Sequence, residues 1–135
     1  MATYNKFQPW VDYLTEGVNC ATDQFVVALT NTLPVNTYAT LSQISEISYT
    51  NLSSRNLTTT SSSQTGGTFS LKFSNLTLTA SGAVGPFQYV VIYDDTVTGD
   101  PLVAWFDYGS AITMANTDTF TLTFDSINGL FTVGP

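Results

Sequence analysis

Apolar residues near the start of the chain recur at intervals of three and four positions, as on one face of a helix. The stripe consists of Phe7, Trp10, Val11, Leu14 and Val18. It predicts a helix within residues 4–17, with Asn5 and Gln8 spaced for a capping box, Pro9 in the first turn and Gly17 at the end. Two interpretations of the stripe stay open: the helix binds a partner, or it covers an open end of a sheet.

The rest of the chain is dominated by strand patterns bounded by turn residues. Residues 24–31 are mostly apolar and predict a buried strand. Residues 87–93 form the strongest candidate for a core strand, and residues 102–108 are expected to pair with them antiparallel across the turn at 94–101. Further strands are expected at residues 69–73, 76–78, 119–124 and 130–133.

Between these strands the pattern becomes irregular at several points. Residues 50–67 are almost entirely Ser, Thr, Asn and Leu, which predicts an exposed, irregular arm or loop with one edge strand around 57–61. Residues 40–48 suit a short helical turn. Apolar alternation changes phase at Ser74-Asn75, which predicts a bulge or tight turn. Asn128-Gly129 is typical of a hairpin turn before the last strand.

The spacing of strands and turns indicates the fold class. About seven or eight short strands, with turn signals every 8 to 12 residues, are typical of sandwiches and jelly rolls. We therefore expect one all-β domain over residues 1–135: an antiparallel, jelly-roll-like β-sandwich with one short N-terminal helix. The length of 135 residues suits a single domain.

Charge changes this picture by excluding several classes of partner. The net charge is −7, and the three cations Lys6, Arg55 and Lys72 are scattered. Nucleic-acid binding requires a basic face, and anionic membranes attract basic segments, so we expect neither partner. Only 10% of residues are charged, and a neutral polar surface is desolvated at lower cost in a protein contact.

The beginning of the chain and its thiol content favour cytoplasmic synthesis. The first residues lack the basic and apolar regions of a signal peptide, and no apolar run reaches the length of a membrane-spanning helix. A single cysteine, Cys20, excludes a disulfide within the chain. We therefore expect folding in a reducing cytoplasm.

The residue types present offer little catalytic chemistry. The chain contains no histidine, so histidine-assisted nucleophiles and Cys/His zinc sites are excluded. Cys20 is expected to be a buried, inert thiol. Asp94, Asp95, Asp100 and Asp107 form the remaining group, with carboxylate catalysis and a calcium site as the alternatives to solvated turn residues. We expect a non-enzymatic protein without cofactor or metal.

Two stretches of the chain resemble small virion proteins of tailed bacteriophages. The first holds an amphipathic helix and the motifs YNKF at 4–7, LTNT at 29–32 and ISEIS at 44–48. The second holds GPFQYVVIYDD at 85–95, DPL at 100–102 and WFDYGS at 105–110. The resemblance covers most of the chain, but residues 50–67 depart from the glycine-rich loop more usual at this place.

The resemblance implies a capsid decoration (cement) protein with a jelly-roll-like fold. Such proteins sit as dimers or trimers on the outside of the head and bridge neighbouring major capsid subunits. The expected partners are thus the major capsid protein and further copies of the chain, and the expected location is the outer capsid surface after synthesis in the host cytoplasm. The residues expected to make these contacts are Phe7, Trp10, Leu14, Leu52, Arg55 and Leu57.

Two other functions remain open from the sequence. The same fold could serve as a phage tail-fibre or baseplate module that binds host-surface glycan through Tyr38, Tyr49 and Tyr108. A hydrolase that uses carboxylates between Asp94 and Asp107 is the third possibility. Host-polysaccharide binding, and turnover lost on replacement of Asp95 and Asp107 by Asn, are the observations that would distinguish them.

Overall fold

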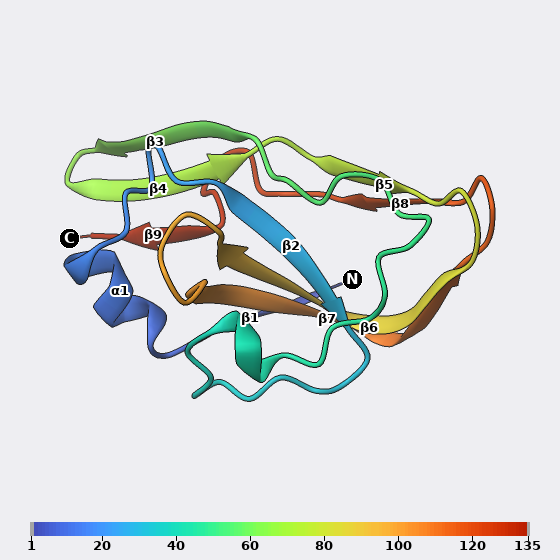
Figure 1. Ribbon diagram of the computed structural model, residues 1–135. Helices are drawn as coiled ribbons and strands as arrows, with labels where there is room; N and C mark the ends of the chain where they lie inside the picture. The colour runs from blue at the N-terminus through green and yellow to red at the C-terminus, as the bar shows by residue number, and fades with distance from the viewer. Residues whose placement is uncertain (1, 135) are drawn as a thin grey trace.

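The computed structural model describes residues 2–134 as two layers of antiparallel strands with one α-helix near the N-terminus (Figure 1). Within these residues there are nine strands, and a short 3-10 helix, η1, lies in a long loop. The elements are β1 (Thr3–Lys6), α1 (Trp10–Glu16), β2 (Phe25–Thr30), η1 (Leu41–Gln43), β3 (Thr59–Thr65), β4 (Thr68–Phe73), β5 (Leu76–Thr79), β6 (Val84–Asp94), β7 (Leu102–Met114), β8 (Thr119–Leu122) and β9 (Phe131–Val133).

The first layer is a four-stranded sheet in the order β1-β7-β6-β2. The second layer consists of the sheet β3-β4-β9 and the pair β5-β8, and every pairing is antiparallel. The expected break at Ser74-Asn75 separates β4 from β5. The all-β, antiparallel, jelly-roll-like sandwich with one short N-terminal helix is confirmed, with nine strands in residues 2–134 rather than seven or eight.

The main core lies between the two layers. Edge-to-face aromatic contacts run through it from Trp10 to Phe25, from Phe25 to Phe73 and from Phe73 to Phe124. Every residue of β2 is buried, because its second face packs under the loop that carries η1. This burial on both faces explains why β2 and much of β6 read as nearly continuous apolar runs.

The predicted helix begins later than expected. Residues 3–6 form β1, which pairs with β7, and α1 begins only at Trp10. Pro9 is the N-cap residue without a side-chain cap, while the Asn5 amide donates to the Thr3 carbonyl, so the expected capping box is wrong. Residues 3–6 pair with the distant strand β7, and this pairing overrides the local preference for a helix, which is all that the sequence pattern reports. Gly17 ends the helix as expected.

The Ser/Thr-rich segment is more ordered than its composition suggests. Residues 59–65 form β3, which pairs with β4 through the turn at Gly66-Gly67. Before β3, the chain bonds to the edge of β2: the Val27 amide donates to the Arg55 carbonyl at 3.0 Å, and the Leu57 amide donates to the Phe25 carbonyl at 2.9 Å. The prediction for residues 50–67 holds in outline: residues 50–58 form no strand and are mostly exposed, and an edge strand follows, at 59–65 rather than around 57–61. The buried Leu57 is the part that was not expected.

The last strand, β9, pairs with a strand that lies far from it in the sequence. Asn128-Gly129 does lie in a turn, but β9 pairs with β4 and not with the preceding strand β8. Gly129 has φ +78°, and its backbone lies directly against the Leu71 carbonyl. This close approach brings the chain back to β4, with the Leu130 amide donating to the same carbonyl at 2.7 Å.

We expect Gly129→Ala to lower the free energy of unfolding by about 2–3 kcal/mol, because an added Cβ meets both a positive φ and the Leu71 carbonyl. Gly109→Ala is the matched control, since Gly109 has φ +82° with open space around its Cβ direction. Its expected loss is about 1 kcal/mol, from backbone strain alone. Urea unfolding of both variants checks this; equal losses would contradict the close approach at Gly129.

Candidate functional site

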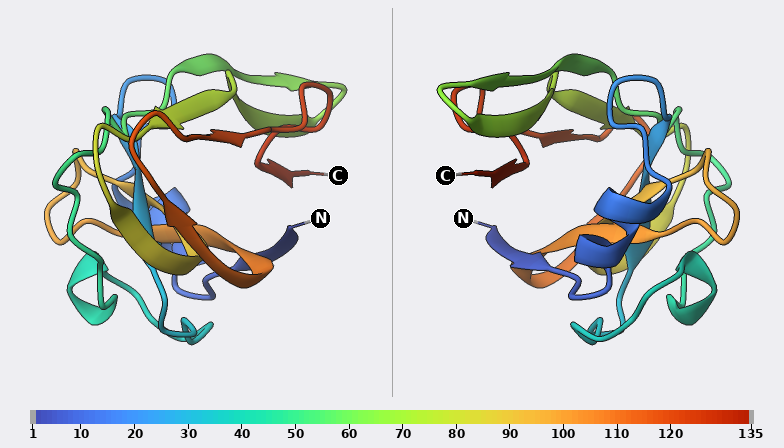
Figure 2. Two further views of the ribbon diagram at one scale, coloured as in Figure 1. Left: turned by 90° about the vertical axis from the view of Figure 1, so that its right-hand side faces the viewer. Right: turned by 90° about the vertical axis from the view of Figure 1, so that its left-hand side faces the viewer.

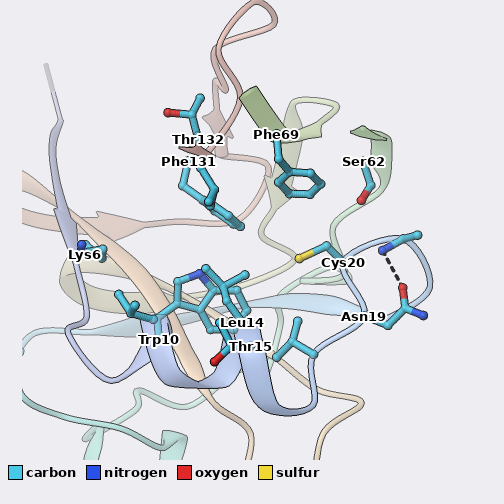
Figure 3. A pocket seen from close by; sticks show the side chains of 14 residues that line it. Lys6, Trp10, Leu14, Thr15, Asn19, Cys20, Ser62, Phe69, Phe131 and Thr132 are labelled. Atoms are coloured by element: carbon cyan, nitrogen blue, oxygen red, sulfur yellow. Dashed lines mark hydrogen bonds between the residues drawn. The ribbon is translucent and has the colours of Figure 1, made fainter. Parts of the chain in front are cut away.

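An apolar groove lies between α1 and the β3-β4-β9 sheet (Figure 3). Its volume is about 590 Å³, within the range of sites that take a small molecule or a short peptide segment. Helix α1 and the loop after it form one wall, and strands of the second layer form the other. The main apolar residues that line it are Trp10, Leu14, Val18, Phe69, Phe131 and Val133. We call this feature the α1–β9 groove.

The groove exists because one side of the sandwich is left open. On the opposite side, the segment before β3 bonds to the edge of β2 and closes the gap. On the groove side, β1 ends the first layer and β9 ends its sheet in the second, and Figure 2 shows both chain ends there. A second groove of about 600 Å³ lies between β7 and residues 121–125.

The rim of the α1–β9 groove exposes apolar surface. Val11 on the helix and Val133 on β9 are each 49% exposed. Lys6 is the single charged residue among those that line the groove within residues 2–134, although the chain carries a net charge of −7. The surface is thus locally apolar with one positive charge, in contrast to the acidic remainder.

The floor of the groove holds a hydrogen-bond donor without an acceptor. Trp10 is 1% exposed, and its Nε1 atom is buried with no hydrogen-bond partner in the described part of the chain. The indole packs edge-to-face with Phe131, with ring centroids 5.9 Å apart. Figure 3 shows Nε1 on the side of the ring that faces the groove. Buried indole N–H groups usually find an acceptor, and Trp10 Nε1 is one of two buried side-chain polar atoms without a partner in the described residues.

Of the residues expected to contact a partner, three belong to the core. Phe7 is fully buried beneath the outer loop, Trp10 lies under the groove, and Leu57 is 4% exposed in the main core. The interpretation in which the helix covers an open end of the sheet agrees with the packing of Trp10. Leu14 is half-buried and lines the groove, and Leu52 is half-buried against the core elsewhere.

Arg55 lies in a structural network away from the groove. Its guanidinium donates to the Val27 carbonyl and stacks 3.6 Å from the centre of the Tyr49 ring. The Tyr49 hydroxyl donates to Glu46 at 2.6 Å and accepts from the Leu29 amide at 2.9 Å. Arg55 therefore fastens the segment before β3 to the edge of β2, a role that the sequence did not indicate.

Sequence reasoning missed the second wall of the groove. Phe69 and Phe131 were assigned to strands without a role at a surface, yet they lie across from Leu14. The signal was weak: Phe131 and Val133 alternate in the last strand, but nothing local shows that this strand ends a sheet beside the helix. Only the pairing of β9 with β4 places them there.

The four aspartates considered for catalysis or calcium do not form one site. Within residues 2–134, no group of three or more His, Cys, Asp or Glu side chains is placed to hold a metal ion. Asp107 accepts from Gln88 at 3.0 Å and from the Gly109 amide at 2.8 Å, and these bonds lower the pKa of its carboxyl. Asp95 is exposed, and burial raises the pKa of Asp100.

Cys20 lies in surroundings made acidic by Asp94 and Asp23. Cys20 is half-buried beside the groove, not fully buried as expected. Burial, together with the charges of Asp94 and Asp23, raises the pKa of its thiol to about 11. The thiol is therefore protonated at neutral pH, which makes it a poor nucleophile.

Comparison with protein-family models, curated proteins and solved structures finds no match for this chain. No helix in residues 2–134 is long and apolar enough to cross a membrane. The α1–β9 groove is therefore interpreted from its own geometry, as an apolar recess with one cation and one unsatisfied donor.

Proposed function

We propose that this chain is a non-enzymatic structural protein of a tailed-phage virion that binds the outside of the capsid and bridges major capsid subunits. The observation that carries the proposal is the α1–β9 groove, an apolar recess whose rim exposes Val11 and Val133. Exposed apolar recesses with polar surroundings are typical of protein contacts. The resemblance of residues 4–48 and 85–110 to phage decoration proteins supplies the partner class.

The sandwich suits this task physically. The two layers share one aromatic core, and the segment before β3 closes one side of it. The groove side is left for contacts. A protein that binds only the assembled shell stabilises it by mass action, by about 2.7 kcal/mol at a concentration one hundred times the dissociation constant. Dimers or trimers would place several such grooves over neighbouring subunits and strengthen binding through multivalency.

We expect purified chain to co-sediment saturably with bare capsids of the phage that encodes it and to raise their melting temperature. Cryo-electron microscopy of the mixture should show density of this size at regular positions on the outer head surface. Shells mixed with an unrelated acidic β-sandwich serve as the control. Absence of binding to shells, or location of the protein at the tail in intact particles, would overturn the proposal.

The alternative of a tail module that binds host glycan has less support in the geometry. Tyr49 uses its hydroxyl within the protein, and Tyr108 packs edge-to-face on Phe120 with centroids 5.0 Å apart. Tyr38 packs against the buried residues on the face of β2 under the η1 loop. All three tyrosines are half-buried against the core, which leaves little of each ring for stacking on a sugar. Binding to purified host polysaccharide, with location at the tail, would favour this alternative.

A further inference from the structure

The outer edge of β9 is an open place in the hydrogen-bond network. Its inner edge pairs with β4 through Phe69↔Val133, Ser70↔Thr132 and Leu71↔Phe131. In residues 2–134 no strand pairs with the other edge, and β9 ends its sheet. An edge of this kind accepts a further strand when a partner offers an extended segment. Here the edge borders the α1–β9 groove, because Phe131, Thr132 and Val133 all line it.

The groove adds side-chain recognition to this edge. Alternate residues of an added strand would point toward the helix wall, where Leu14 and Val11 offer apolar contact. The Trp10 ring lies beneath this lining and packs edge-to-face with Phe131, which supports the apolar floor of the groove. Lys6 supplies the single charge of the lining.

We infer that the α1–β9 groove receives an extended, mainly apolar peptide segment of a partner protein, which adds as a strand to β9. The segment carries one acidic residue that faces Lys6, and its backbone bonds to the free edge at Phe131–Val133. This inference rests on the proposed function, since it names the part of the capsid subunit that the groove would hold. Binding of isolated peptides to the groove tests it without capsids.

Charge favours a different protein over a second copy of this chain. A second copy brings its net charge of −7 to an equally acidic molecule, so copies that associate are expected to meet at another face. The groove, with one positive charge and no acidic lining residue, stays open to a segment of a different protein. The free strand edge favours a peptide over an aliphatic acid, because only a peptide backbone satisfies a row of amide and carbonyl groups. One experiment distinguishes a peptide from both alternatives, a second copy of the chain and an aliphatic acid.

The test uses the full chain and displayed random peptides about ten residues long, roughly twice a typical strand. Selected peptides are synthesised and titrated by calorimetry against wild type and three variants. Val133→Glu places a charge on the apolar rim, Lys6→Gln removes the cation, and Ile127→Glu makes the same kind of change at a site 77% exposed outside the groove. Each variant's melting temperature is measured first to establish that it folds.

We expect the selected peptides to alternate apolar residues and to carry one acid. Val133→Glu should weaken their binding at least about tenfold and Lys6→Gln about threefold, while Ile127→Glu leaves it unchanged. Amide hydrogen exchange should slow within Phe131–Val133 when peptide is bound, because strand addition places backbone hydrogen bonds on this edge. These results together support strand addition at β9.

Three outcomes would overturn the inference. They are selected peptides that bind Val133→Glu as tightly as wild type, self-association through this face with no peptide captured, and dodecanoate binding in place of peptides. Capsid binding separates this inference from the proposed function. If Val133→Glu decorates shells normally, the inference about the groove is wrong and the decoration role stands. If wild type captures peptides but does not bind shells, the inference about the groove stands and the decoration role is wrong.

Discussion

Replacement of Trp10 by alanine is expected to lower the free energy of unfolding by about 3–5 kcal/mol. Trp10 is the largest fully buried side chain contributed by α1, and it joins the helix to both layers. Its ring contacts Phe25 in the first layer, with centroids 6.2 Å apart, and Phe131 in the second, at 5.9 Å. Removal leaves a large cavity under the groove, and the helix loses its anchor.

The control is Val11→Ala, one position along the same helix. Val11 is 49% exposed, so its truncation should change stability by less than about 0.5 kcal/mol. Trp10→Phe is a second comparison: it keeps an aromatic ring but removes Nε1, which has no acceptor, and should cost less than the alanine variant. Urea unfolding followed by fluorescence and circular dichroism gives all three values.

The outcome also decides between two roles that the sequence left open. A Trp10→Ala variant with undiminished stability but weakened capsid binding would mean that the indole acts at an interface and not as a core residue. A large loss of stability with Trp10→Ala, together with a small one for Val11→Ala, places Trp10 in the core. In that case the helix offers Val11 and Leu14 to a partner, and Trp10 supports them from the core.

Elements whose information is local could be predicted from the sequence. The run of residues 87–93 lies within β6, and residues 102–108 lie within β7, which pairs with it antiparallel as expected. Both strands are consecutive along the chain and separated by turn residues, so no distant contact had to be known. The buried strand β2 was predicted for the same reason, since apolar runs of this length have few other structures available.

Features that depend on distant pairing could not be predicted. Phe7 fits the helical stripe, yet it follows β1, whose partner lies about one hundred residues away in β7. The segment before β3 has the composition of a loop, but the edge of β2 supplies bonds that hold Leu57 in the core. The groove joins α1, β4 and β9, so no single stretch of sequence carries its pattern.

Asp94 occupies a position that makes stability depend on pH. The residue is fully buried at the end of β6. Its Oδ1 accepts from the Thr96 amide at 3.0 Å and more weakly from the Val97 amide at 3.4 Å, while Oδ2 receives no hydrogen bond. Burial, and next the neighbouring Asp23 carboxyl, raise the pKa of Asp94 to about 7. When protonated, Oδ2 can donate to Asp23; when ionised, it is an unpaired buried charge.

The sign of the pH effect follows from this shift. The folded state holds the Asp94 proton up to about pH 7, whereas the unfolded chain releases it near the ordinary value of 3.8. Between these values the folded state binds more protons, so stability falls as pH rises. The contribution of Asp94 is fully present below pH 3.8 and is lost as pH rises through about 7. The loss amounts to about 2–4 kcal/mol.

Asp94→Asn is therefore expected to stabilise the protein by about 2–4 kcal/mol at pH 8 and to change it little near pH 4. The amide keeps the acceptor for Thr96, can donate to Asp23, and does not ionise. Asp95→Asn is the control, because it removes the same charge from an exposed neighbour and should leave the pH dependence of wild type in place. Urea unfolding at intervals from pH 4 to 9 gives the difference between each variant and wild type. If the free energy of unfolding depends on pH in the same way for wild type and Asp94→Asn, Asp94 is ionised in the folded protein throughout this range. Asp23 and the Cys20 thiol then lie beside a negative charge that does not destabilise the fold.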